Sequence, residues 1–343
     1  MSTEQDSTFD DPTETTPAAV AHQTTGIGMT SSSSRGTEYY SKCIVLLITV
    51  LGAAANGLVL YAMVAAKQHR KHVLIFNQNA LDLVNCLFLS VSLSVELSNK
   101  YLSGTSGYWL CLILLNNLVS FAGLYGSLIN LAAISIERYL KIVHHVWAKN
   151  KLRNWMIYSA MAFAWVAGFL CSAALAIPTA SVVNGVCYSG MLFLSPTGRK
   201  AYWIWDFLSF YVTILFLFIY CYGRILVVIR RQARVMAAHS GQASNTAQDQ
   251  SSKIQTSVIK TMTVVSVLFA VTYAPIHVYT FLVDYNAALF HENVLSSIVF
   301  IAYLYVCVNP FIYATKFAPV KRVLLGLITC KKNVHAAESG GNT

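Results

Sequence analysis

Glu137, Arg138 and Tyr139 place an acid and a base side by side at the end of a long uncharged segment. No residue from Leu110 to Ile136 is ionised at neutral pH, and about 20 apolar residues suffice to cross the hydrocarbon core of a bilayer. The pair is therefore expected where a membrane helix meets water, where a charge pair can be made and broken at low cost. The alternative is an interfacial ion pair with no further role, worth about 0–1 kcal/mol.

The whole chain has the composition of a membrane protein. Of its 343 residues 56% are hydrophobic and 11% are charged, whereas soluble domains average about 25% charged residues. A closed β-barrel would show alternating segments of about 10 residues, but the apolar segments here are twice as long and do not alternate. We therefore expect an all-α membrane protein with seven transmembrane helices. The predicted spans are roughly 43–66, 74–97, 110–136, 155–177, 207–223, 261–283 and 294–315.

Lysine and arginine predict the orientation of the chain. They gather in the connections after spans one, three and five and in the tail after span seven, so the amino terminus is expected outside and the tail in the cytoplasm. This divides the chain into a disordered extracellular segment (1–41), the seven-helix domain (42–317) with a third cytoplasmic loop at about 232–256, and an amphipathic helix with a tail (318–343). The net charge of +10 then reflects topology, and no nucleic-acid partner is expected.

Eight cysteines are spread along the chain without the spacing of metal ligands. Cys111, at the outer end of span three, and Cys187, in the loop after span four, fall on the extracellular side, where the compartment is oxidising. We expect a disulfide between them. Cys43 and Cys171 are rival partners, and unpaired thiols are the alternative.

Polar residues inside the spans carry a resemblance to a known family. They are Asn56 in span one, Asp82 in span two, Glu137-Arg138-Tyr139 at the end of span three, Trp165 in span four, Tyr273-Ala274-Pro275 in span six and Asn309-Pro310-Phe311-Ile312-Tyr313 in span seven. In this order, and each on its span, they resemble the motifs of rhodopsin-class (class A) G-protein-coupled receptors over about residues 40–332. The sequence assigns no subfamily. The resemblance implies a plasma-membrane receptor with a short eighth helix, a heterotrimeric G protein as partner and arrestin as a further candidate.

Four positions depart from the family pattern. Tyr273 stands where a tryptophan is usual, Ile214 replaces the usual proline of span five, and His145 stands where a proline is common. Cys111 falls about two residues early. These departures bear on the ligand class and on switching, and they leave the expected fold intact.

The resemblance implies a G-protein switch around Arg138, which Glu137 would hold in the off state. The base of span six, residues 251–255, contains no acid, so we expect a loosely held off state with basal signalling. Tyr222 and Tyr313 are implied to approach each other through water when span six moves.

That movement is implied to centre on Pro275, because a proline removes one backbone hydrogen bond from its helix. Phe269 and Tyr273 would form the switch beside it. For Tyr222 and Tyr313 the alternative is an anchoring role at the membrane surface.

Asp82 is a carboxylate near mid-membrane, which costs roughly 2.5–3.5 kcal/mol and marks a functional site by default. The resemblance implies Asn56, Ser127 and Asn309 as its partners and a sodium ion as an allosteric ligand, since oxygen ligands suit a hard cation. The alternative is a protonated Asp82 hydrogen-bonded to Asn309. No other cofactor is expected.

The outer half of the bundle supplies the ligand-binding candidates, namely Asn117, Ser120, Phe121, Asp206, Ser209, His277 and Tyr303. Ser120 stands where amine receptors carry an aspartate, and Tyr303 stands where opsins carry the retinal lysine. Neither a standard monoamine mode nor a photopigment is therefore expected. Asp206 helps to make the outer face negative and favours a cationic ligand or a basic peptide. Alternatively, Asp206 reaches interfacial water.

Other classes of protein fit the sequence less well. A transporter would show inverted repeats and broken helices, and an enzyme would show a nucleophile motif, a metal-ligand cluster or a phosphate loop. We expect a receptor, with a non-signalling scavenger of the same fold as the alternative and a seven-span transporter as a more distant one. Cys330, after the amphipathic segment 319–328, is a candidate for palmitoylation or a free thiol, with membrane lipid as a partner.

Overall fold

The computed structural model describes residues 32–98, 101–188, 196–238, 246–286, 289, 291–316 and 318–328. The chain divides into two compact units, Met1–Lys42 and Cys43–Thr343, and the second unit carries the predicted sites. Its long helices are α2 (Ser32–Ala65, beginning in the first unit), α3 (Val73–Leu97), α5 (Leu118–Val143), α7 (Asn154–Thr179), α9 (Thr213–Ala238), α10 (Thr246–Tyr285) and α11 (Glu292–Lys316).

Shorter elements extend or connect these helices. They are α4 (Gly104–Leu110), α6 (His145–Lys151), α8 (Pro196–Asp206), α12 (Ala318–Ile328) and two π-helical segments, Cys111–Leu115 and Phe207–Val212. Strands β1 (Ser181–Val183) and β2 (Val186–Tyr188) form an antiparallel hairpin in which Val182 pairs with Cys187.

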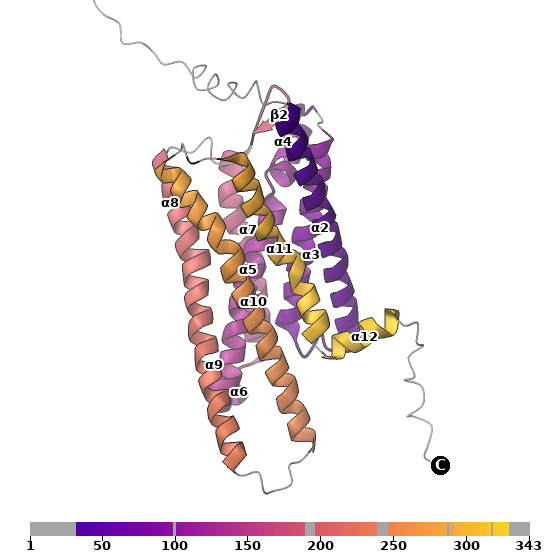
Figure 1. Cartoon of the computed structure of the whole chain (residues 1–343), viewed down its shortest axis with the longest axis vertical. Helices are drawn as coiled ribbons and strands as arrows, with labels where there is room; N and C mark the ends of the chain where they lie inside the picture. The colour runs from indigo at the N-terminus through magenta and orange to yellow at the C-terminus, as the bar shows by residue number, and fades with distance from the viewer. Residues whose placement is uncertain are drawn as a thin grey trace, which may run out of the picture. The chain divides into compact units, whose positions relative to one another are not determined.

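The helices confirm the predicted seven-span bundle. Six helical segments in the described part of the chain are long and apolar enough to cross a membrane, and a shorter apolar stretch, Ser297–Ile312, lies within α11. In Figure 1 the long helices stand side by side, and α12, the expected eighth helix, turns across the end of α11. Three helix boundaries differ from expectation. The first helix already begins at Ser32, and α9 and α10 run further than predicted, which leaves a connection of residues 239–245, outside the described residues.

Span three is wound in an unusual way near Cys111. After α4 the chain makes the π-helical turn 111–115 and then breaks at Asn117, whose φ of 54° is left-handed, before α5 begins. A π turn holds more residues than an α turn, and asparagine tolerates the left-handed region better than most residues. The wide turn and the break therefore place more residues between Cys111 and α5 than a continuous α-helix of the same length would hold.

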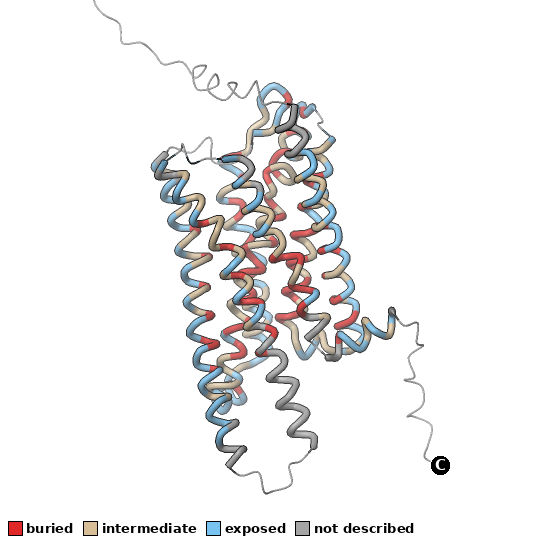
Figure 2. Tube along the Cα trace, in the orientation of Figure 1, coloured by how far each residue is buried: buried red, intermediate tan, exposed pale blue. Residues whose placement is uncertain are grey.

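Small residues let α5 and α7 approach closely. A Cβ atom on Gly168 would lie 2.6 Å from Ala122 O and from Gly126 N, so only glycine fits this crossing, as is common where membrane helices pack. Buried residues line the facing sides of the helices in Figure 2. Large apolar side chains such as Phe163 (63% exposed) and Phe216 (71% exposed) point outward, where lipid would cover them.

Candidate functional site

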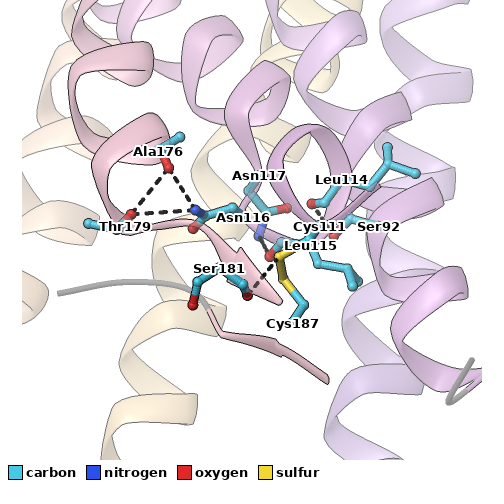
Figure 3. The surroundings of a disulfide bond; sticks show 10 residues. All are labelled: Ser92, Cys111, Leu114, Leu115, Asn116, Asn117, Ala176, Thr179, Ser181 and Cys187. Carbon is cyan, nitrogen blue, oxygen red and sulfur yellow. Dashed lines mark hydrogen bonds between the residues drawn. A yellow bond between two sulfur atoms is a disulfide. The ribbon is translucent and has the colours of Figure 1, made fainter. Parts of the chain in front are cut away.

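The predicted disulfide is confirmed and defines one end of the bundle. Cys111 and Cys187 are bonded, with Cα atoms 5.4 Å apart, and the bond joins the π-helical start of span three to β2. Figure 3 shows the bond beside Asn116, whose Nδ2 donates to Ala176 O (2.9 Å) on α7. The rival cysteines, Cys43 and Cys171, are free thiols. We call this the disulfide end and the opposite end, with Arg138, the arginine end.

At the arginine end, Arg138 and Lys141 share Glu137. Arg138 Nη2 lies 3.2 Å from Glu137 Oε2, and Lys141 Nζ lies 2.5 Å from Glu137 Oε1. Glu137 and Arg138 are both buried, and the buried Arg138 Nε has no hydrogen-bond partner among the described residues. The carboxylate therefore divides its attraction between two cations, and it holds Arg138 by one edge only.

His72 is a second contact of Arg138 that the sequence did not predict. It precedes α3, and its Nδ1 lies 3.4 Å from Arg138 Nη2. A guanidinium can only donate, so Nδ1 must accept and the imidazole is neutral. Burial, together with the charges of Arg138, Lys141 and Lys71, lowers the pKa of His72 to about 4, and the charge of Glu137 opposes them.

This contact predicts a pH dependence of stability. Because the pKa of His72 falls from an unfolded value of 6.5 to about 4 in the fold, the folded state favours neutral His72. Its contribution is complete above about pH 6.5 and is lost as the pH falls toward 4. His72→Asn should therefore flatten the decline of the thermal unfolding midpoint between pH 6.5 and 4.5. His144→Asn, at the same end, should keep the wild-type slope, and an unchanged slope in His72→Asn would refute the assignment.

The tyrosines of the arginine end make other contacts than the implied pairing. The buried Tyr222 hydroxyl lies 3.1 Å from Ser135 Oγ on α5. Tyr139 contacts His144 Nε2 (3.1 Å) and the Tyr220 hydroxyl (3.3 Å). The side chain of Tyr313 and residues 251–255 lie outside the part of the chain whose side chains are described. The approach of Tyr222 to Tyr313 therefore stays a prediction.

Asp82 lies fully buried in the middle of the bundle and accepts three hydrogen bonds. The donors are Ser127 Oγ (2.6 Å), Asn309 Nδ2 (3.1 Å) and Gln78 Nε2 (3.4 Å). Two of the three partners implied by the resemblance are thus in place. The third, Asn56, is corrected by the structure, because its amide donates to Gly52 O (3.0 Å) on its own helix. Gln78, one turn before Asp82 on α3, takes that position instead.

Three aromatic rings lie side by side where span six meets span seven. The ring centroids of Phe269 and Tyr273 are 5.1 Å apart, and that of Tyr273 is 5.5 Å from Tyr305 in an edge-to-face arrangement. All three residues are buried, and Pro275 lies in the same helix, α10. The structure therefore packs Phe269 and Tyr273, two of the three residues predicted for the span-six switch, into one aromatic cluster with Tyr305.

Toward the disulfide end, Asp206 lies where three spans converge. It ends α8 directly before the π-helical segment 207–212, and only 7% of its surface is exposed. The Tyr125 hydroxyl of α5 donates to Asp206 Oδ1 (3.0 Å), and His277 Nδ1 of α10 lies 3.9 Å from Asp206 Oδ2. Tyr202 extends the network through its hydroxyl, 2.9 Å from that of Tyr125. The alternative in which Asp206 reaches interfacial water is therefore wrong.

The other ligand candidates do not join this carboxylate in one network. Ser120 Oγ donates to Asn85 Oδ1 (2.9 Å) of α3, and Asn117 Nδ2 donates to Leu115 O (3.4 Å) at the break in span three. Phe121, Ser209 and Tyr303 are half-buried. Of the predicted set, Asp206 and His277 form the paired centre of the site.

A comparison with family models settles which family the chain belongs to. Residues 55–313, most of the chain, match the model for the 7 transmembrane receptor (rhodopsin family). The chain is a receptor of the rhodopsin family. The receptors of this family are not enzymes, so the expectation of a non-enzymatic membrane receptor is confirmed.

Named relatives of the receptor differ widely in the ligands that their names carry. It is 27% identical to human free fatty acid receptor 3 over 61% of this chain and 64% of that protein. It is 30% identical to the C5a anaphylatoxin chemotactic receptor 1 of Cavia porcellus over 38% of this chain and 36% of that protein. It is 25% identical to apelin receptor B of Danio rerio over 86% and 84%. The match thus spans less than two thirds of the first relative.

The receptor also resembles a solved structure. Squid rhodopsin superposes with a TM-score of 0.68 at 17% identity, covering 87% of this chain and 88% of that one. At this identity the likeness speaks for the fold alone.

Several polar residues of the receptor's sites were not predicted from the sequence, among them Gln78, Lys141 and His72. Gln78 lies four residues from Asp82, and Lys141 lies four residues from Glu137. This spacing places two side chains on one helix face, so both contacts could have been predicted from the sequence. The contact between His72 and Arg138 joins residues 66 positions apart and had no local signal.

Proposed function

We propose that the receptor converts the binding of an extracellular cationic ligand into activation of a heterotrimeric G protein at the plasma membrane, with its amino terminus outside. This proposal rests on the way in which Arg138 is bound: its ion-pair partner Glu137 also binds Lys141, and the ion pair with Glu137 uses only one nitrogen of the guanidinium, Nη2. Glu137 is divided between Arg138 and Lys141, and Arg138 Nε is buried without a partner among the described residues. A guanidinium held in this way is ready to be released to a binding partner.

The ligand class follows from Asp206 and its aromatic surroundings. A buried carboxylate with one donated hydrogen bond retains acceptor capacity for a positive group. Rings of Phe207, Tyr211 and His277 lie beside it, with centroids 5.0–5.7 Å apart, and cations are attracted to aromatic faces. The names of the relatives carry free fatty acid, the C5a anaphylatoxin and apelin, so they do not decide the ligand class.

Two further parts of the proposal concern the membrane. In α12 the exposed Lys321 and Arg322 suit lipid headgroups, while Val320 is fully buried, which fits a helix lying at the membrane surface. Cys330, the palmitoylation candidate, lies outside the described residues. Arrestin remains a proposed partner on the same face as the G protein.

The test uses purified full-length receptor in lipid nanodiscs with purified G-protein heterotrimers of each class. The probes are a panel of aliphatic and aromatic amines and basic peptides, with carboxylic acids of matched size. We expect nucleotide exchange above that of empty nanodiscs with at least one heterotrimer, and acceleration by an amine or a basic peptide. Arg138→Ala should abolish exchange, and Asp206→Asn should weaken the response to that probe at least about tenfold, the equivalent of 1.4 kcal/mol.

Thr213→Val is the matched control for Asp206, because Thr213 lies on the same span but bonds only its own helix through Leu208 O. It should respond as wild type. Stimulation by carboxylic acids alone would refute the cationic class. A probe that raises the thermal unfolding midpoint without any exchange would refute signalling and favour a non-signalling scavenger.

A further inference from the structure

A continuous chain of side-chain hydrogen bonds runs from span four to Asp82. Trp165 Nε1 donates to Asn77 Oδ1 (2.8 Å), and Asn77 Nδ2 donates to Asn130 Oδ1 (2.9 Å). Asn130 Nδ2 then donates to Gln78 Oε1 (2.9 Å), and Gln78 Nε2 donates to Asp82 Oδ1 (3.4 Å). Except for Trp165, each member of this amide chain is at most 3% exposed. Bulk solvent therefore does not reach the amides.

The indole at one end fixes the direction of every bond in the amide chain. An indole N–H can only donate, so Asn77 must present its oxygen to Trp165 and its nitrogen to Asn130. The same reasoning passes to Asn130, whose nitrogen faces Gln78. The carbonyl oxygen of Gln78 must therefore accept from Asn130, and the NH₂ group of Gln78 faces Asp82.

This direction decides what can sit beside Asp82. A hard cation is held by several oxygen ligands, but the carboxylate is surrounded by donors: the Gln78 and Asn309 amide nitrogens and the Ser127 hydroxyl. Gln78 Nε2 also makes a close hydrogen bond to Ser127 Oγ. The NH₂ group thus lies between the two oxygens, of Asp82 and Ser127, that a cation would have to bridge.

Turning Gln78 over would not open the site at low cost. Its NH₂ would then face the NH₂ of Asn130, and both groups would lose a buried hydrogen-bond partner. Asn309 Oδ1 lacks a hydrogen-bond partner among the described residues, but it is a single oxygen on an amide whose nitrogen already faces Asp82. The residues present therefore do not fit the sodium ion that the family resemblance implies.

We propose that the Gln78 amide is a built-in substitute for a cation at Asp82, and that it closes this site to sodium. The partial positive charge of the NH₂ group, oriented by Trp165 through Asn77 and Asn130, takes the place of the ion. The carboxylate is satisfied by donors from spans two, three and seven in the absence of any ion.

The test is the thermal unfolding midpoint of full-length receptor in NaCl, KCl and choline chloride at equal ionic strength, so that no ligand is needed. Wild type should unfold at the same midpoint in all three salts. Gln78→Met, which removes the donor, and Gln78→Glu, which replaces it with a second carboxylate, should gain a midpoint rise that is specific to NaCl and saturates with concentration. Adding Asp82→Asn to either variant should remove the gain.

Asn79→Met is the matched control, because Asn79 is equally buried on the same helix but donates to Ile75 O (2.8 Å) of its own helix. It should show no preference for NaCl. A sodium-specific rise in wild type that Asp82→Asn abolishes would overturn the proposal. Folded Gln78→Met and Gln78→Glu receptors without a sodium response would equally overturn it, since Gln78 would then not be what excludes the ion.

Discussion

Asn130→Leu is expected to destabilise the receptor by roughly 2–4 kcal/mol, because this one amide of α5 bonds two buried amides of α3, Asn77 and Gln78. Leucine has the same number and branching of side-chain heavy atoms as asparagine, but it leaves Asn77 Nδ2 without its acceptor and Gln78 Oε1 without its donor. Each unpaired buried group costs about 1–3 kcal/mol in proteins generally, and single interhelical hydrogen bonds in membranes average about 0.6 kcal/mol. The expected loss lies between these two scales, because the substitution removes two hydrogen bonds at once at a site buried from bulk solvent.

Asn56→Leu offers a control with the same change of residue type at the same burial. Both asparagines are 0% exposed, but Asn56 Nδ2 bonds only Gly52 O on its own helix and its Oδ1 has no partner among the described residues. Replacing Asn56 should lower the free energy of unfolding by less than about 1 kcal/mol, because no other side chain loses a hydrogen-bond partner. The measurement is the thermal unfolding midpoint of both variants in one detergent or lipid. Equal losses would show that burial, and not the amide chain, sets the cost.

The sequence predicts the membership of the Asp82 site better than its chemistry. Asp82, Ser127 and Asn309 could be named from their places in successive spans. The sequence did not show that amides from neighbouring helices orient one another, because that depends on how α3 and α5 are rotated about their axes. Hydropathy fixes the spans but not this rotation, so Gln78 and Asn130 passed unnoticed although both are polar residues within spans.

For the site around Asp206, too, the sequence predicted a member of the site but not its surroundings. Asp206 was predicted as a candidate, but an alternative in which it meets water stayed open. The π-helical turn 207–212 follows it directly, and a wider turn changes which side of span five faces the bundle. The residue pattern of segment 207–212 did not predict a π-helical turn. The burial of Asp206 against Tyr125 and His277 therefore had to come from the structure.

Breaking the disulfide between Cys111 and Cys187 is also expected to lower the stability of the receptor by a large amount. The bond closes a loop with a sequence separation of 76, and chain entropy alone would assign about 4–5 kcal/mol to such a loop. An unfolded receptor in a membrane keeps much of its helical structure, so the free chain is a poor reference and the loss should fall below that figure. Cys187→Ser is the variant of choice, because Cys111 is fully buried and a serine there would add an unpaired hydroxyl.

Cys171→Ser is the matched control, since Cys171 is a half-buried free thiol and the same atom is exchanged. We expect Cys187→Ser to lower the thermal unfolding midpoint and Cys171→Ser to leave it nearly unchanged. Hydrogen exchange should rise first in residues 111–117, because the left-handed Asn117 ends the π-helical turn there. Without the disulfide, the described side-chain hydrogen bonds that still tie this turn to neighbouring helices are those of Asn116 to α7 and of Ser92 to Leu114 O. Faster exchange spread evenly over all spans would instead mean that the bond stabilises the bundle as a whole.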